Sequence, residues 1–401
     1  PSVAVIGAGG AGLSAGRLLR EEGCRVTIFD KSDEVGGVWR YRPEPEAHAP
    51  MYRSLVTNLP KEIMSFFGYP FPEELPSFTT HAQVLDYLRA YTSHYNLGSL
   101  IKHGCRVESV RPLPLSGDGT SSTTPTTQRV SNIDVVADLA NRQVPQGFVS
   151  VQDVGGVVGW RGLRDDGQGG NKSWRSENDA LGKWMVVYSQ NPLGSSSSGK
   201  AAYSPSIKTE IFDAVCVCNG HYEEPFTPAT EGFDSFRGIS LHSRAYDTPD
   251  VKEFVGKRVL CVGSRSSGTD VAREVSSVAS VVHVCDRSVD ATLEGGGDLG
   301  NVCWRPALMR FEGSNGVRFK DGTSAEIDTV VWCTGYSYSF PFLEGSGLLT
   351  PPVTERVHPL YEQVFHVQHP SLSFVGLPQS IVPFPLFDLQ ANAVAAAISG
   401  R

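Results

Sequence analysis

The chain has 401 residues, of which 40% are hydrophobic and 19% are charged, and its formal net charge is −8 at pH 7. This length allows two or three domains, and the composition excludes disordered, collagen-like and coiled-coil proteins. The charges form no long runs of either sign, which argues against a nucleic-acid partner or a polybasic membrane surface and favours a small-molecule ligand.

The first thirty residues predict a strand, a helix and a second strand. We place these elements at residues 3–7, 11–22 and 25–30, where two short apolar runs flank a helical pattern. This βαβ order is typical of a nucleotide-binding fold. Further along, a hydroxyl cap at Thr79 or Thr80 predicts the start of a helix with a core-facing apolar stripe.

Three glycines stand between the first strand and the first helix. Gly7 permits a tight turn, Gly9 lets the backbone approach a pyrophosphate, and Gly12 lets the helix pack close to the strand. The N-terminus of the helix would then face the phosphates. Asp30 ends the second strand, where a carboxylate can accept hydrogen bonds from ribose hydroxyls. The combination favours a dinucleotide site over a simple tight turn.

The middle of the chain changes composition three times, and we interpret the biased stretches as loops or disordered insertions. These stretches are 112–131, 155–170 and 194–206. Strand-like segments surround them and predict an interrupted β-meander rather than a separate domain. The segments are 105–110, 184–189 and 209–218.

The βαβ pattern returns in the second half of the chain, with a strand at 258–262, a helix at 267–278 and a strand at 281–286. Gly263 and Asp286 are 23 positions apart, as are Gly7 and Asp30. Two units with matched helix lengths would give this repeat. The sequence therefore predicts two dinucleotide sites.

The second glycine turn differs from the first. Arg265 stands at the position of the middle glycine and prevents the closest backbone approach, which suits a nucleotide that binds more loosely. Arg287 and Ser288 follow the last strand of the unit and can pair with a 2′-phosphate, which favours NADPH. Two alternatives stay open: Asp286 could instead hold the free 2′-hydroxyl of NADH, and Arg287 could be a solvated surface charge.

The eight cysteines are scattered, and several lie in apolar strand-like runs, so we expect buried free thiols in a reduced, cytoplasmic compartment. No zinc-type spacing is present, and we expect Cys216 and Cys218 to alternate across a strand, so no metal is predicted. No apolar run is long enough to span a bilayer. Because the chain begins without Met, we allow for a trimmed N-terminal targeting segment.

Four further motifs together resemble the flavin-containing monooxygenases, which use FAD, NADPH and O2 to oxygenate soft nitrogen and sulfur nucleophiles. The FxGxxxHxxxY pattern is complete and ends in Tyr, where Baeyer–Villiger relatives typically have Trp. The similarity runs from residue 7 to about residue 390. The four motifs are Phe236 to Tyr246, Gly36-Gly37-Val38-Trp39, Met51 to Leu55 with Thr57-Asn58-Leu59-Pro60, and Thr334-Gly335-Tyr336.

The resemblance implies an α/β protein of two Rossmann-like dinucleotide-binding domains, with the NADPH domain inserted into a discontinuous FAD domain. We expect the FAD domain to comprise residues 1–219 and 331–401, and the NADPH domain residues 220–330. Pro383 to Phe387 would return to the flavin and help to enclose the substrate space.

The resemblance also implies the reaction. NADPH would reduce the flavin, O2 would add to give a C4a-hydroperoxyflavin, and this species would transfer one oxygen atom to an amine or sulfide, giving an N- or S-oxide. Asn58 is our candidate catalytic residue, because its amide donates a hydrogen bond without supplying a proton. Alternatively, Asn58 caps the turn before Pro60.

A larger set of residues is expected to bind FAD or NADPH. Trp39 would pack under the flavin edge, and His242 and Tyr246 would belong to a linker that positions the NADPH domain, with no catalytic role. We assign no ligand role to His366 or His369. The expected cofactor-binding residues are Gly7, Gly9, Gly10, Gly12, Asp30, Lys31, Gly37, Val38, Trp39, Thr57, Asn58, Leu59, Val107, Gly263, Ser264, Ser266, Ser267, Gly268, Arg287, Ser288, Thr334, Gly335 and Gln390.

Other functional classes share parts of this pattern. A pyridine-nucleotide disulfide reductase needs a redox cysteine pair beside the flavin, and no CxxxxC follows the first βαβ unit. A Baeyer–Villiger monooxygenase is the enzymatic alternative, and a flavoprotein sensor that does not oxygenate is the other. Neither the particular amine or sulfide nor the oligomeric state can be inferred from the sequence.

Overall fold

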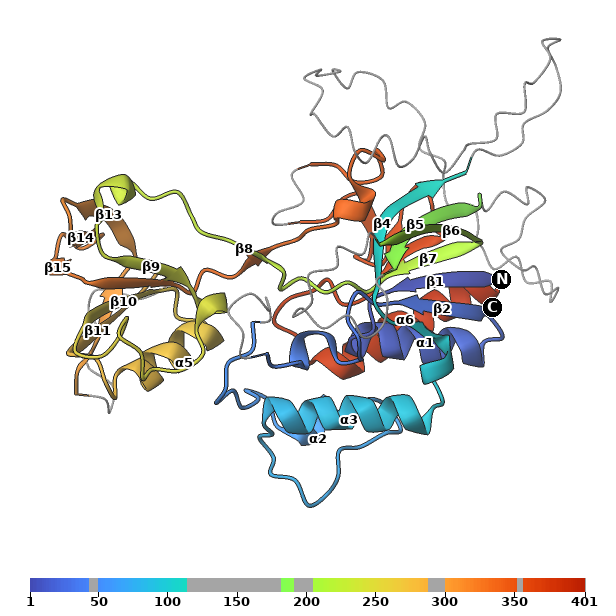
Figure 1. Ribbon diagram of the computed structural model, residues 1–401, viewed down its shortest axis with the longest axis horizontal. Coiled ribbons are helices and arrows are strands. Elements are labelled where there is room, and N and C mark those ends of the chain that lie inside the picture. Colours follow the sequence, from blue (N-terminus) through green and yellow to red (C-terminus); the bar gives the residue numbers. More distant parts are fainter. Residues whose placement is uncertain (43–49, 114–181, 191–204, 288–299, 352–355, 401) are drawn as a thin grey trace, which may run out of the picture.

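The computed structural model describes residues 1–42, 50–113, 182–190, 205–287, 300–351 and 356–400 (Figure 1). The predicted insertion at 155–170 lies outside the described residues, as do nearly all of 112–131 and 194–206. The predicted α/β class is confirmed, because two mainly parallel sheets each carry helices.

The first sheet has seven strands in the order β18-β19-β20-β7-β1-β2-β3, and the five from β20 to β3 pair in parallel. Its central strands β1, β7 and β20 are buried on both sides, as is typical of parallel sheets. Val3 and Val5 pack toward the helices, whereas Ala4 and Ile6 pack toward the opposite layer. The strands are β1 (Ser2–Ile6), β2 (Arg25–Phe29), β3 (Ile101–Lys102), β7 (Ala214–Val217), β18 (Leu360–Tyr361), β19 (Phe365–His366) and β20 (Leu372–Phe374).

Two helices pack together on one face of this sheet, α1 (Gly10–Glu21) and α6 (Pro383–Ser399), with α2 (Lys61–Met64) and α3 (His81–His94) beyond them (Figure 1). The predicted cap of α3 is confirmed: Thr80 Oγ1 accepts from the backbone N–H of Gln83, and the Gln83 side chain bonds back to Thr80, forming a capping box.

The other face is covered by an antiparallel sheet, β4 (Cys105–Pro112), β5 (Trp184–Gln190) and β6 (Ser206–Phe212). This sheet confirms the predicted meander. The expectation of one strand over 209–218 is wrong, however, because the chain breaks at Asp213 and β7 enters the first sheet. Asp213 is held at the break by the backbone N–H and the hydroxyl of Ser2, at 2.7 and 2.8 Å.

The second parallel sheet has the strand order β12-β11-β10-β16-β9, with α5 (Ser266–Val275) on one side and a small antiparallel sheet on the other. The helix predicted at 267–278 is α5, and it ends at Val275 rather than at Val278. The strands are β9 (Ile239–His242), β10 (Arg258–Val262), β11 (Val281–Asp286), β12 (Val302–Pro306) and β16 (Thr329–Trp332) in the parallel sheet, and β13 (Leu308–Glu312), β14 (Gly316–Phe319) and β15 (Ser324–Glu326) in the antiparallel one.

The chain crosses between the two parallel sheets twice, and the crossings pair with each other as β8 (Glu224–Pro225) and β17 (Tyr336–Ser337) (Figure 1). In chain order, the second sheet is thus inserted between β7 and β18 of the first, and its last strand, β16, ends at Trp332. Short 3₁₀ helices complete the described elements, at η1 (Gly37–Trp39), η2 (Gly98–Leu100), η3 (Phe233–Ser235), η4 (Ser243–Ala245) and η5 (Pro341–Leu343).

All eight cysteines are free thiols, and seven of them are buried. The expectation that Cys216 and Cys218 lie on opposite sides of a strand is wrong, because residues i and i+2 share a side. Their Sγ atoms are 3.6 Å apart. Among the described residues, no group of three or more His, Cys, Asp or Glu side chains could hold a metal ion.

Candidate active site

A cavity of about 1830 Å³ is lined by residues of both parallel sheets. Gly7 and Gly9 of the first glycine turn line it, and so do Gly263 and Ser266 of the second. Both turns follow the carboxyl end of a central parallel strand, β1 or β10, where ligands of open α/β sheets bind. The repeat predicted from the sequence therefore converges on one space.

The first turn leaves no room for side chains. Gly7 has φ +106°, and a Cβ there would lie 2.5 Å from the carbonyl oxygen of Cys218. A Cβ on Gly12 would lie 1.8 Å from the carbonyl oxygen of Gly7, so α1 packs against the turn as predicted. Asp30 accepts from the backbone N–H of Ala8 at 2.5 Å and from that of Ser32 at 2.7 Å. Its carboxylate therefore also fastens the turn, a role the sequence analysis missed.

The Gly36 to Trp39 segment lies directly against this turn. The Gly36 N–H donates to the carbonyl of Ala8 at 3.0 Å, and a Cβ on Gly37 would stand 3.0 Å from the Cα of Gly9. Trp39 packs against the ring of Phe384 on α6, with centroids 6.5 Å apart. Two motifs separated in sequence thus form one narrow glycine-lined cradle that a pyrophosphate can enter.

Arg40 is a residue that the sequence analysis missed. It lines the cavity but is only 7% exposed. Its Nη2 binds Asp33 at 2.5 Å and its Nε binds Glu34 at 3.1 Å, while its buried Nη1 has no hydrogen-bond partner within the described protein. A buried guanidinium N–H without a partner is costly, so this donor fits an anionic or polar ligand group in the cradle.

The second glycine turn has the same backbone hydrogen bond and the same close helix packing as the first. The Ser264 N–H donates to Asp286 at 3.0 Å, as Ala8 does to Asp30. A Cβ on Gly268 would lie 1.9 Å from the carbonyl oxygen of Gly263. Ser264 and Gly268, like Gly12 in the first unit, support the turn from behind the cavity wall.

Two arginines of this second unit line the cavity with exposed side chains, Arg265 at the N-terminus of α5 and Arg287 just after β11. Ser288, predicted to accompany Arg287, lies outside the described residues. Exposed guanidiniums at these two places could pair with phosphate groups of a nucleotide.

Asn58 lies where the two halves of the molecule meet. Its Nδ2 donates to Ser266 Oγ in the first turn of α5 at 2.9 Å. Thr57 anchors the segment, because its backbone N–H donates to the carbonyl of Thr79 and its Oγ1 accepts from the Thr79 N–H. The amide of Asn58 is therefore directed across the cavity, whereas the alternative had it capping the turn before Pro60.

The remaining predicted residues have mixed positions. Ser267, Thr334 and Gly335 line the cavity, the last two beside a crossing strand. Gln390 lies behind the wall, where its Oε1 accepts from the N–H of Gly376, a lining residue, at 2.9 Å. Pro383, Phe384 and Phe387 of α6 line the cavity as well. The other predicted residues that line the cavity are Gly10, Asp30, Lys31, Gly37, Val38, Trp39, Thr57, Asn58, Leu59 and Val107.

The histidines considered in the sequence are held by backbone groups. His242 Nδ1 accepts from the N–H of Arg244 at 3.1 Å, and its Nε2 lies 3.0 Å from the carbonyl oxygen of Gly335. His366 Nε2 lies 2.7 Å from the carbonyl oxygen of Leu348. Burial lowers the pKa of both rings. These contacts give both side chains a structural explanation.

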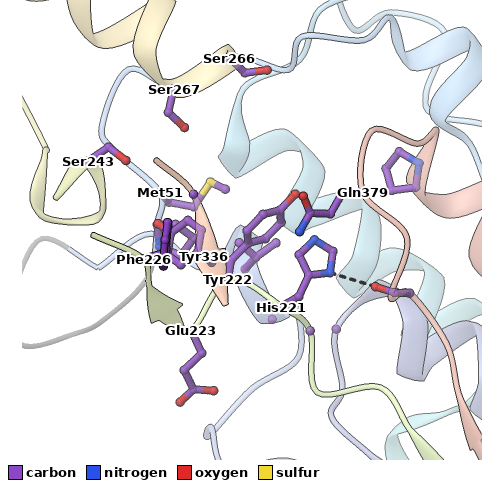
Figure 2. A pocket seen from close by; sticks show the side chains of 18 of the residues that line it. Met51, His221, Tyr222, Glu223, Phe226, Ser243, Ser266, Ser267, Tyr336 and Gln379 are labelled. Carbon is purple, nitrogen blue, oxygen red and sulfur yellow. Dashed lines mark hydrogen bonds between the residues drawn. The ribbon is translucent and has the colours of Figure 1, made fainter. Parts of the chain in front are cut away.

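A different histidine, His221, follows β7 and lines the cavity (Figure 2). Its Nδ1 lies 3.0 Å from the carbonyl oxygen of Gly376, and its buried Nε2 has no partner within the described protein. Burial lowers the pKa of His221, so the ring is neutral at pH 7. The ring of Tyr222 packs against His221 and that of Tyr336 packs against Tyr222, so together these rings make this part of the cavity aromatic (Figure 2).

The fold and the cavity define a class of protein with two dinucleotide-type turns that face one shared space. Comparison with known proteins agrees. The model of the flavin-binding monooxygenase-like family matches residues 1–130, 202–298 and 289–401. In Arabidopsis thaliana, flavin-containing monooxygenase FMO GS-OX-like 2 is 32% identical over 423 residues, which is 100% of this chain and 74% of that protein.

Solved structures give the same result. S-allyl-L-cysteine S-oxygenase from Allium sativum superposes with a TM-score of 0.75 and 31% identity, covering 100% of this chain and 77% of that one. A flavin-containing monooxygenase from Stenotrophomonas maltophilia has the same fold, with a TM-score of 0.64 and 23% identity over 99% of this chain and 98% of that one.

The chain belongs to the flavin-binding monooxygenase-like family. It is an oxidoreductase, a flavin monooxygenase that uses FAD and NADPH. The glycine cradle and the unpartnered Nη1 of Arg40 fit a bound dinucleotide. Within the part of the chain that the structure describes, no helix is long and apolar enough to cross a membrane.

Proposed function

We propose that this chain transfers one oxygen atom from O2 to a soft nitrogen or sulfur nucleophile, giving an N-oxide or an S-oxide. The observation that carries the proposal is the position of Asn58, a donor that does not ionise. It lines the cavity that both glycine turns share and donates to Ser266 beside the second turn. Sulfur is the first class to test, because a relative named as an S-oxygenase is similar over the whole chain.

Each of the two parallel sheets is assigned one cofactor. We assign FAD to the first glycine turn, with the α1 N-terminus at its pyrophosphate and Arg40 as a further donor, and NADPH to the second turn, with Arg287 at its 2′-phosphate. The domain division expected from the sequence, 1–219 with 331–401 and 220–330, is part of this proposal. Bound FAD, reduced by NADPH, supplies the activation of O2.

The protein's own part is to orient, to donate hydrogen bonds and to withhold protons. Asn58 donates from an amide that stays neutral at every relevant pH, and His221 is uncharged at pH 7 because burial lowers its pKa. Stray protons would release the activated oxygen as peroxide, so these neutral groups suit a site that must hold it for a substrate.

The test is a product balance on the purified FAD-loaded enzyme with NADPH. Methyl phenyl sulfide, trimethylamine and cyclohexanone are supplied separately, and oxygenated product and hydrogen peroxide are measured per NADPH consumed. We expect sulfoxide or N-oxide to account for most of the NADPH. Lactone from cyclohexanone would favour the Baeyer–Villiger alternative, and peroxide alone with every substrate would contradict oxygen transfer.

Asn58→Ala is expected to leave FAD bound but to lower the oxygenated product per NADPH by about tenfold, the scale of one lost hydrogen bond to a reacting group. The measurement is the same product balance, with FAD content from the visible spectrum. Asn58→Asp, of equal size but without the donor, should be at least as uncoupled. An unchanged product ratio in both variants would remove Asn58 from the mechanism.

A further inference from the structure

One face of α5 carries a row of polar side chains directed at the segment that contains Asn58. Ser266, Asp270 and Glu274 are four residues apart, so they lie one above another along the helix. Each accepts a hydrogen bond from a residue of the range 52–58. Ser266 is also the N-terminal residue of α5, beside the second glycine turn.

The contacts of this row are short and specific. Asn58 Nδ2 donates to Ser266 at 2.9 Å, Tyr52 OH donates to Asp270 at 3.0 Å, and Ser54 Oγ donates to Glu274 Oε1 at 2.6 Å. The partners are separated by 208, 218 and 220 positions in sequence. These contacts join residues 52–58, which lie between β2 and β3 of the first sheet, to α5 of the second sheet.

Glu274 holds a third part of the chain as well. Its Oε2 accepts from the hydroxyl of Tyr246 at 2.6 Å, while Oε1 receives Ser54. Tyr246 is the last residue of the FxGxxxHxxxY pattern, and its ring packs against that of Tyr52 with centroids 5.5 Å apart. One carboxylate thus joins the linker pattern, the Asn58 segment and α5.

The tyrosine hydroxyls in this network remain donors. Burial raises the pKa of Tyr52 and Tyr246, and the neighbouring carboxylates Asp270 and Glu274 raise it further. The rings are 6% and 3% exposed, whereas Ser54 is exposed. The network therefore has a buried aromatic base and one accessible hydroxyl that can be altered without disturbing a core.

We propose that Glu274 is a positioning residue, which acts through Ser54 to fix Asn58 relative to the nucleotide turn at the start of α5. The inference rests on the proposed role of Asn58 and extends it. Loss of the carboxylate or of the Ser54 hydroxyl removes the middle one of the three contacts between the 52–58 segment and α5, and leaves those of Tyr52 and Asn58. Asn58 then keeps its chemistry but is held less firmly relative to the nucleotide turn at the start of α5.

The experiment compares Glu274→Gln, Ser54→Ala and the double variant with wild type. Ser54→Ala, at an exposed position, guards against misfolding, and Ser54→Thr restores a hydroxyl. Glu326→Gln is the matched control, because Glu326 pairs with Arg258 elsewhere in the same half of the molecule. FAD content, Tm, product and peroxide per NADPH, and NADP⁺ affinity from the flavin absorbance are measured for each.

We expect both single variants to keep wild-type FAD content and Tm while product per NADPH falls about threefold to tenfold and NADP⁺ binds more weakly, on the scale of the net contribution of one hydrogen bond. The double variant should be no worse than Glu274→Gln, since both changes break one contact. Ser54→Thr and Glu326→Gln should behave as wild type.

Two outcomes separate this inference from the proposed function. If wild type oxygenates no sulfide or amine, the proposed function fails, and the positioning role is then decided by NADP⁺ affinity alone. If Ser54→Ala and Glu274→Gln change neither the product ratio nor NADP⁺ affinity, or if their effects add fully in the double variant, the positioning role is overturned. A fall in Tm without a change in either readout would also overturn it, because that is the effect of a purely structural contact.

Discussion

Gly12→Ala is expected to weaken FAD binding by about fivefold to more than a hundredfold. The added Cβ would stand 1.8 Å from the carbonyl oxygen of Gly7, and that atom belongs to the backbone of the turn itself, so α1 and the turn must separate. Overpacking of this kind costs about 1–3 kcal/mol or more, which corresponds to a loss of affinity of about fivefold to more than a hundredfold. The measurement is the FAD retained after gel filtration, together with the Kd from quenching of flavin fluorescence.

The second half of the molecule offers a matched variant. In Gly268→Ala the Cβ would lie 1.9 Å from the carbonyl oxygen of Gly263, a nearly identical clash. This variant should keep FAD but lose reduction by NADPH. Gly98→Ala is the neutral control, because no atom lies within 4 Å of the new Cβ. If Gly12→Ala retains FAD, or if Gly268→Ala is the variant that loses it, the assignment of the two turns is wrong.

Local rules explain why so much of the fold could be predicted. A βαβ unit is encoded within about thirty residues by apolar runs, a glycine turn and a helical pattern, and both units fold as expected. The cap at Thr80 is likewise local, since the capping box involves only Gln83 three residues on. Gly7 and Asp30 have the same spacing as Gly263 and Asp286. In the structure, each aspartate accepts a hydrogen bond from the N–H of the residue after its glycine, Ala8 or Ser264.

The unpredicted features depend on partners that are far apart in sequence. The break at Asp213 is stabilised by Ser2, which is 211 positions away in sequence, and so could not be inferred from the apolar run that surrounds it. The contacts of Glu274 join residues brought together only by the insertion of one sheet into the other. Arg40 had one usable signal, a basic residue directly after the Gly36 to Trp39 motif with acidic residues shortly before it.

Arg287→Ala is expected to raise the KM for NADPH by about tenfold to a hundredfold and the KM for NADH by less than about twofold. A charge-assisted hydrogen bond contributes about 1.5–3 kcal/mol, and only NADPH has the 2′-phosphate that would receive it. The competing assignment gave the free 2′-hydroxyl of NADH to Asp286. The structure directs one oxygen of that carboxylate to the Ser264 N–H, as Asp30 is directed to Ala8, so fastening the turn is its first role.

Two further variants, at Arg265 and at Arg287, test whether Arg287 binds the 2′-phosphate of NADPH. Arg265 lines the same cavity from the start of α5, where we expect it to meet the phosphates common to both nucleotides, so Arg265→Ala should raise both KM values by similar factors. Arg287→Lys keeps the charge but loses the planar fork, and it should retain part of the preference for NADPH. Steady-state rates with each nucleotide give the ratio of the two KM values for wild type and for the three variants. Equal effects of Arg287→Ala on NADPH and NADH would show that this side chain is a solvated surface charge, which was the other interpretation of its position.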